Sequence, residues 1–488
     1  MSRSMNQKII AQMFPVHDPV TRDQLQRGWI KVLTKLPPID GIFNYFGSKI
    51  GLYFAWLQHY TWALAIHVLV GILFWMFQGR NQSILKGASS YDDMNSISFA
   101  FFNVIWATLY LKSWKRRSFE LTYKWKTFSS QKELASEPRP LFKGEEKISD
   151  ITGQVEMFYP PWKTKVFRYF VSVPVISICL FVCFATVVIS LRLQDWWDEE
   201  IGVWCFIPKV FLATSIPILN FVYEKIAPFL NDMENHRTEE THQNNLIVKL
   251  ILFQFMNSFL SLFYVAFYLQ DMETLTSLLT TILITRQFIG TAKESFLPYA
   301  IQHFNLLSMA LKDSSTLNPT HIKAEFSQIE RESSSPNYKG TYEEYMEIFV
   351  QFGYVTFFSS VYPLAGFLAL LNNIFEIRGD ALKLCVAYQR PFGERVANIG
   401  VWQGAMESMG VIAIIVNCAL ICQSGQIYNF FPDMSKASMI LLVVGLEHGM
   451  LLTKVLINRA IPDMPTWVER ELMRLEYRRN ELDRTNIM

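Results

Sequence analysis

Two long runs of the chain contain no Asp, Glu, Lys or Arg, one between Lys49 and Arg80 and the other between Arg168 and Arg192. Either run exceeds the ~20 apolar residues that a helix needs to cross a bilayer. We therefore predict an all-α polytopic membrane protein with ten transmembrane helices. The other eight expected spans lie at about 94–112, 201–224, 249–270, 273–299, 342–362, 364–386, 398–423 and 435–460.

The composition supports this class and argues against several others. Of the 488 residues, 51% are hydrophobic and only 18% are charged, which is too apolar for an ordinary soluble protein of this length. No segment resembles a basic, aromatic nucleic-acid groove, so we expect no nucleic-acid partner. The six cysteines form no CxxC pair and fall mostly in apolar segments, so we expect buried thiols. No nucleophile constellation or phosphate loop stands out, so we do not expect an enzyme.

The loop charges predict the orientation in the membrane. The segment 112–165 is rich in Lys and Arg, whereas the connections at 194–200 and 271–273 are acidic. By the positive-inside rule the basic loop is cytosolic, and ten spans then leave both termini in the cytosol. The sequon at Asn81 falls in a predicted outer loop. The N-terminus has no apolar core of signal-peptide type, so insertion should rely on the first membrane helix.

These expectations divide the chain into three parts. A remnant of an N-terminal cytosolic region precedes a ten-helix transmembrane domain, which has two cytosolic loops and is followed by a cytosolic tail. Charges alternate at helical spacing within that tail, which predicts a solvated helix. The boundaries are 1–48 for the first part, 49–461 for the second with its loops at 113–165 and 300–341, and 462–488 for the third.

Two pairs of carboxylates flank a long uncharged stretch. Glu344 and Glu347 are three residues apart and Glu376 and Asp380 are four apart, so each pair shares one helix face. The sequence VYPLAG around Pro363 predicts a tight turn between two antiparallel helices. Since either pair lies ~25 Å from this turn along its helix, the hairpin brings the four carboxylates to a similar depth.

Four carboxylates at one depth repel one another unless a cation joins them. A hard divalent cation suits such a set, and calcium suits it better than magnesium. The alternative is that these helix ends protrude into the cytosol, where the carboxylates pair with Arg378 or Lys383 on a solvated face. Glu294 favours the metal site, because Gly290 and Pro298 lie about one turn away and let a fifth carboxylate swing onto the ion.

Polar residues recur in the expected spans between 201 and 299. Small-residue packing and interhelical hydrogen bonds explain many such residues. The alternative is a polar furrow that hydrates a chloride ion or a lipid headgroup, and nearby basic residues would favour an anion or a phosphate. The candidate furrow residues are Thr214, Ser215, Asn257, Ser277, Thr281, Thr285 and Arg286.

The segment EEYMEIFVQFGYVTFFSSVYPLAGFLALLNNIFEIRGDALKL (343–384) resembles the calcium-binding hairpin of the anoctamins, a family of calcium-activated chloride channels and phospholipid scramblases. Four further segments are similar to family signatures in the same order along the chain. The resemblance covers nearly the whole chain and is nearest the anoctamin-10 and anoctamin-8 branch. The four segments are YFGSKIGLYFAWLQHYT (45–61), WKRRSFELTYKW (114–125), RPFGERVANIGVWQ (390–403) and IPDMP (461–465).

This resemblance implies a ligand set and an assembly. It implies two calcium ions per subunit between the sixth, seventh and eighth helices, and a membrane-exposed furrow from the third to the seventh. It also implies a homodimer formed through the tenth helix, which contains Glu447 and His448; a local interhelical hydrogen bond is the alternative role for that pair. The implied calcium ligands are Glu294, Glu344, Glu347, Glu376 and Asp380.

The chain departs from the family pattern at four points. Gly290 stands where the family carries an asparagine ligand, and Lys112 stands where an additional calcium site carries a glutamate, so we do not expect that additional site. The outer loops lack the cysteines typical of the plasma-membrane chloride channels. The folded N-terminal domain of the family is almost absent, which suggests a short isoform or an incomplete gene model.

The leading hypothesis is a calcium-regulated transport protein of the plasma membrane or endoplasmic reticulum. It would scramble phospholipids, conduct chloride or other small anions, or do both. The alternative is an intracellular membrane tether or a regulator of other channels with little transport of its own. Lipid scrambling depends on the spacing between two helices, so residue identity does not separate a lipid from an ion as the permeant species.

Overall fold

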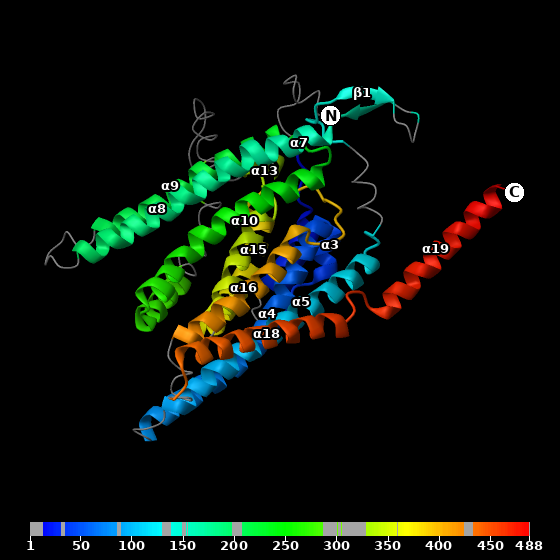
Figure 1. Ribbon diagram of the computed structural model, residues 1–488. Coiled ribbons are helices and arrows are strands. Elements are labelled where there is room, and N and C mark those ends of the chain that lie inside the picture. The colour runs from blue at the N-terminus through cyan, green and yellow to red at the C-terminus, as the bar shows by residue number, and fades with distance from the viewer. Residues whose placement is uncertain are drawn as a thin grey trace, which may run out of the picture. The chain divides into compact units, whose positions relative to one another are not determined.

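The computed structural model is mostly helical and forms two compact units, one built from residues 1–128 and 276–488 and the other from 129–275 (Figure 1). The structure describes residues 13–30, 35–84, 89–128, 138–148, 153, 155–197, 207–285, 300, 304, 328–358, 360–423 and 433–487.

In the first unit, α4 lies against α3, α5 and α15, while α16 lies against α5, α14 and α18. Large aromatic side chains such as Trp56, Trp114 and Phe352 are fully buried between these helices. The elements are α2 (Pro19–Leu25), η1 (Gln26–Ile30), α3 (Ile39–Phe46), α4 (Ser48–Ile84), α5 (Ser89–Lys124), α13 (Gln328–Ser333), α14 (Tyr342–Phe357), α15 (Ala365–Leu382), η5 (Lys383–Ala387), α16 (Val401–Gln423), α18 (Lys436–Ala460) and α19 (Thr466–Ile487).

Several helices have the length and hydropathy of membrane spans, as a polytopic membrane protein requires. The other expected spans contain helices that are shorter or less apolar, such as α14 with 16 residues. The ten-span topology and the cytosolic termini therefore stay predictions. Among the described residues, the five helices that satisfy both criteria are Ser48–Met76, Pro161–Ser190, Glu239–Leu269, Val401–Gln423 and Ala437–Ala460.

The expected turn around Pro363 is present. Helix α14 ends at Phe357 and α15 begins at Ala365. Between them, the Tyr362 N–H donates to the Phe358 carbonyl at 2.9 Å, and the Ala365 N–H donates to the Tyr362 carbonyl at 3.1 Å. Proline has no N–H to continue a helix, which explains why α14 and α15 are separate elements.

Two glycines allow α4 to pack closely against this turn. A Cβ on Gly366 would lie 2.5 Å from His67 Nδ1, and a Cβ on Gly71 would lie 2.8 Å from the Pro363 carbonyl oxygen. Both distances are too short for a Cβ, so only glycine fits at these two positions without a shift of the neighbouring atoms. The close approach holds α15 against α4, which supplies one wall of the site described below.

The second unit is a bundle in which α8, α9 and α10 contact one another (Figure 1). Its core contains Cys183, Ala227 and the stacked rings of Tyr223 and Phe253, whose centroids are 4.0 Å apart. The elements are β1 (Glu145–Ile148), β2 (Val155–Phe158), α7 (Pro161–Phe167), η2 (Arg168–Ser172), α8 (Val173–Trp197), α9 (Ile207–Met233), α10 (Glu239–Phe263) and η4 (Tyr264–Leu269), followed by a helix over Met272–Thr285 that crosses the boundary between the units.

Strands β1 and β2 form an antiparallel ribbon in which Glu145 lies opposite Phe158 and Ile148 lies opposite Val155. This ribbon falls in the loop 113–165 of a chain predicted to be all-α, so that prediction is wrong for this loop. Each strand has only four residues, and most of their side chains are exposed. A strand without a buried face needs no alternation of polar and apolar residues, so the pattern that would predict a strand from the sequence is missing.

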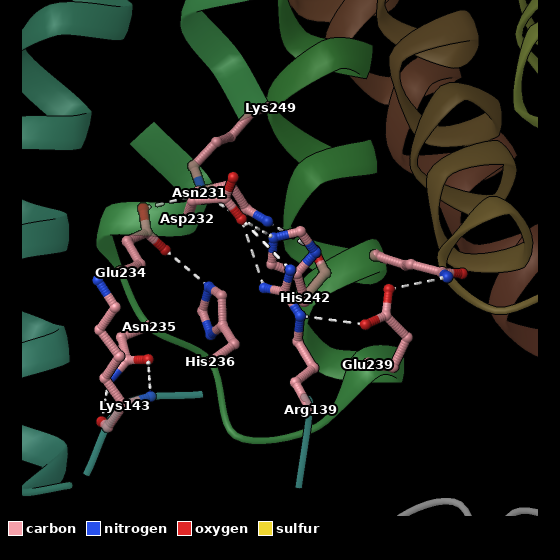
Figure 2. A network of polar contacts seen from close by, with 11 residues as sticks. Arg139, Lys143, Asn231, Asp232, Glu234, Asn235, His236, Glu239, His242 and Lys249 are labelled. Atoms are coloured by element: carbon pink, nitrogen blue, oxygen red, sulfur yellow. Dashed lines mark hydrogen bonds and ion pairs between the residues drawn. The ribbon is translucent and has the colours of Figure 1, made fainter. Parts of the chain in front are cut away.

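The turn between α9 and α10 contains a buried charge network (Figure 2). The Glu234 carboxylate is fully buried and lies 2.9 Å from Lys249 Nζ, 3.0 Å from His236 Nε2 and 3.3 Å from Arg168 Nε. Burial by itself raises the pKa of Glu234, but the hydrogen bonds from His236 and Lys249 outweigh it and lower the pKa to about 2. These contacts join the turn to η2 and to the body of α10.

Candidate functional site

A buried cluster of charged side chains, which we call the hairpin cluster, lies between α14 and the end of α15. It consists of Glu344, Asp380 and Lys383, whose side chains are 4%, 2% and 7% exposed. Lys383 Nζ lies 3.0 Å from Glu344 Oε1 and 3.4 Å from Asp380 Oδ1. One ammonium group balances only one of two carboxylates, so the fully ionised cluster carries excess negative charge.

Aromatic side chains form the wall of the hairpin cluster. The Tyr53 hydroxyl of α4 hydrogen-bonds to Asp380 Oδ2. The Tyr345 ring, adjacent to Glu344 in the chain, lies 5.2 Å from the Tyr53 ring, and Trp402 of α16 stacks on Tyr345 at 5.5 Å. These rings exclude water, and charges interact more strongly where water is excluded.

The other expected ligands are arranged differently. Glu347 is half-buried and lies close enough to Asp380 for their charges to interact. Glu376 accepts a hydrogen bond from Asn372 Nδ2 of its own helix at 2.6 Å. Glu294 and Gly290 lie outside the described residues.

Four of the five expected ligands lie in the described part of the chain, so the complete set of five stays a prediction. Within that part, no group of three or more Asp, Glu, His or Cys side chains could hold a metal ion. The physical reason is that the Lys383 ammonium stands between Glu344 and Asp380, while Glu376 bonds to Asn372. The alternative prediction of pairing with Lys383 holds, but the pair is buried and not on a solvated face. Arg378 instead donates to the carbonyls of Ile374 and Lys35.

Two observations make the residues compatible with a hard cation. Glu344 Oε2 is buried without a hydrogen bond to any described residue. The Asn373 side chain is also fully buried, and neither end of its amide has a hydrogen-bond partner among the described residues. Asn373 shares a face of α15 with Asp380, seven residues further on. Buried oxygen atoms and excess negative charge are what a calcium ion requires.

Asn373 and Tyr53 also belong to this site, although neither was predicted from the sequence. The pair Asn372-Asn373, one turn before Glu376, was a signal that could have identified Asn373. Tyr53 had no comparable signal, because it is 327 residues from Asp380 in the chain. Only the packing of α4 against α15 brings these two side chains together.

The candidate furrow residues fall into two groups. Ser277, Thr281 and Thr285 are exposed at i,i+4 spacing on the helix Met272–Thr285, so they share one face as expected. In the second unit, Asn257 of α10 donates to Asn220 of α9 at 2.7 Å, which is the interhelical hydrogen bond of the alternative prediction. Ser215 lies on α9 and is half-buried, whereas the Thr214 side chain and Arg286 lie outside the described residues.

The expected dimer residues lie on α18. Glu447 is half-buried and His448 is exposed. His448 Nδ1 hydrogen-bonds to the Val444 carbonyl oxygen of its own helix at 2.8 Å. This bond is within one helix and is therefore not the interhelical bond of the alternative prediction. The homodimer stays a prediction.

Comparison with known proteins agrees with the resemblance to the anoctamins. The family described as "Anoctamin: Calcium-activated chloride channel" matches residues 42–475. The chain is 39% identical to human (Homo sapiens) Anoctamin-10 over 491 residues, covering 98% of this chain and 72% of that protein. It is 38% identical to Danio rerio Anoctamin-10, with 97% and 73% covered. It is 32% identical to Mus musculus Anoctamin-8 over 683 residues, with 97% and 64% covered. The match over most of its length shows that this chain belongs to the anoctamin family, as its sequence predicted.

Proposed function

We propose that this protein is a calcium-regulated membrane transport protein that scrambles phospholipids, conducts chloride or other anions, or does both. The observation that carries the proposal is the hairpin cluster, in which two buried carboxylates share one ammonium group, in a chain of a family described as calcium-activated. The proposed ligands are the five carboxylates Glu294, Glu344, Glu347, Glu376 and Asp380, with Asn373 as an additional oxygen donor.

In the arrangement observed here, Lys383 neutralises part of the carboxylate charge and holds α14 and the end of α15 together. Calcium, when bound, supplies a larger positive charge among the same oxygens. Glu344 and Asp380 would hold the ion, and Lys383 would no longer be needed as their counter-charge. Glu294 belongs to the segment that follows the polar face of Ser277, Thr281 and Thr285, so we propose that it connects the cluster to the furrow.

The test is lipid scrambling by the purified full chain in liposomes, titrated with calcium, beside Asp380→Asn. Even groups that only support a metal ligand typically contribute about 10–100-fold to metal affinity, so we expect half-maximal activation at roughly ten times more calcium or above. Chloride flux measured in the same liposomes separates anion conduction from lipid scrambling.

Glu343→Gln is the matched control, because Glu343 precedes Glu344 on α14 but is exposed. We expect it to keep the wild-type calcium dependence. The same calcium dependence in Asp380→Asn would overturn the ligand assignment. Absence of both lipid and chloride transport by the wild type would favour the tether or regulator.

A further inference from the structure

A cavity of about 300 Å³ lies between α5, α16 and α18, away from the hairpin cluster. We call it the α16 cavity. Its volume is at the lower end of the range typical of small-ligand sites. Most side chains that line it are polar or charged, although it lies among apolar helices of the first unit. The lining residues used below are Lys112, Gly404, Glu407, Ser408, Lys454 and Asn458.

Lys454 is the most unusual of these residues. The residue is only 9% exposed, yet no carboxylate among the described residues lies within ion-pair distance of its ammonium group. Lys454 Nζ donates to the Glu407 carbonyl oxygen at 3.0 Å. A Cβ on Gly410 would lie 3.0 Å from the same nitrogen, so the glycine leaves room for the ammonium group. An ammonium group buried in this way needs a counter-charge.

The carboxylates near the α16 cavity are already engaged. Asp463 pairs with Lys112, and also with Lys115 at 2.8 Å. Glu407 accepts from Gln403 at 2.8 Å and lies 3.9 Å from Lys115. The ammonium groups of Lys112, Lys115 and Lys454 therefore outnumber the carboxylates of Asp463 and Glu407, which leaves a net positive charge around the cavity. This charge disfavours a cation and attracts an anion.

We propose that the α16 cavity binds a phosphate group, with Lys454 and Lys112 as its charged contacts. An ammonium group is a common point-charge partner of phosphate, and Asn458 can add a neutral hydrogen bond from the rim. The source is an anionic phospholipid headgroup or free phosphate. Basic pockets between membrane helices near the cytosolic face are typical headgroup sites, and Lys112 precedes the loop expected to be cytosolic.

The experiment is a binding titration of the purified full chain with dioctanoyl phosphatidic acid, with dioctanoylglycerol as the probe lacking phosphate, both without calcium. We expect saturable binding of the phosphatidic acid and none of the dioctanoylglycerol. Lys454→Gln should weaken the binding at least tenfold. Gly404→Leu should weaken it similarly while keeping every charge, because Gly404 lines the cavity and a Cβ there meets no atom within 4 Å.

Lys124→Gln is the matched control, because Lys124 is an exposed lysine of the same helix α5 that does not line the cavity. It should bind as the wild type does. Inorganic phosphate that binds at similar concentrations would support a phosphate site whose source is soluble. The proposal is overturned if neither phosphate probe binds the wild type, or if Lys454→Gln and Gly404→Leu bind like the wild type. Since calcium is absent, failure here leaves the proposed transport function untouched.

Discussion

At the scale of single residues, Lys383 is the most informative side chain of the hairpin cluster. Its ammonium group contacts both Glu344 and Asp380, which we propose as calcium ligands. A cation carried by the chain and a cation from solution then compete for the same oxygens. Buried carboxylates without a nearby cation repel each other strongly, and Lys383 is the cation that contacts both of them among the described residues, so we expect the state without calcium to depend on Lys383.

Replacing Lys383 with methionine keeps the length of the side chain and removes its charge. We expect Lys383→Met to be less stable than the wild type without calcium, and to bind calcium at roughly tenfold lower concentration, because no ammonium group must leave. The measurement is the midpoint of thermal unfolding with and without calcium, where the variant should show the larger increase. Lys383→Arg keeps the charge and should behave like the wild type. An equal increase in all three proteins would show that Lys383 does not compete with calcium.

At the scale of elements, the second unit depends on the turn between α9 and α10. Asn235 adopts a positive φ of 50° there, and its amide hydrogen-bonds to both backbone groups of Lys143 (Figure 2). Arg139 N–H also donates to the Arg237 carbonyl at 2.7 Å. The turn therefore holds the segment before β1 on one side, while Glu234 holds η2 and α10 on the other.

Glu234→Gln should destabilise this unit by about 3 kcal/mol or more, because Lys249 and Arg168 stay in place without their carboxylate. The pH dependence follows from the lowered pKa. The ionised Glu234 contributes its full share to the free energy of unfolding above its ordinary pKa of 4.5, and this share is lost as the pH falls towards about 2.

Thermal unfolding followed from neutral to acidic pH measures both effects. Below pH 4.5 the wild type should lose stability faster than Glu234→Gln, so the difference between them should shrink. Glu146→Gln on exposed β1 should follow the wild type throughout. A constant difference between the wild type and Glu234→Gln at every pH would contradict the assigned role of the carboxylate.

At the scale of the whole molecule, α18 is the least buried of the five long apolar helices in the described part of the chain. Only 11% of its most apolar stretch is buried, and Leu441 is 71% exposed. Gly445 and Gly449 are spaced as in a small-xxx-small motif, and a Cβ on either would meet no atom within 4 Å. Such motifs let two membrane helices approach closely, which supports α18 as the contact of the predicted homodimer.

Gly445→Leu should weaken that dimer at least tenfold while leaving the fold of the subunit unchanged, because there is free space for the side chain within one chain. The measurement is the mass of the purified protein in detergent over a range of concentrations. Val182→Leu, which enlarges an exposed position on α8, should stay dimeric. A monomeric wild type, or a variant that dimerises as the wild type does, would overturn this assignment.

Local rules explain what could be predicted from the sequence. Uncharged runs indicate membrane helices because a bilayer has a fixed thickness, and Pro363 indicates a turn because it lacks an N–H. The same periodicity placed Glu344 and Asp380 on facing helices, where both are buried. The segment carrying Glu294 lies outside the described residues, so its role as a ligand stays a prediction.

The family, the class of membrane protein and the carboxylates of the hairpin could be predicted from the amino-acid sequence alone, because they depend on patterns within a few turns of helix. The groups that those carboxylates contact become known only from the packing of the helices. Tyr53 reaches Asp380 across 327 residues of chain, Lys383 stands between Glu344 and Asp380, and Lys454 enters the space left by Gly410. Such contacts depend on how closely helices distant in the chain approach one another, and helical periodicity does not encode that distance.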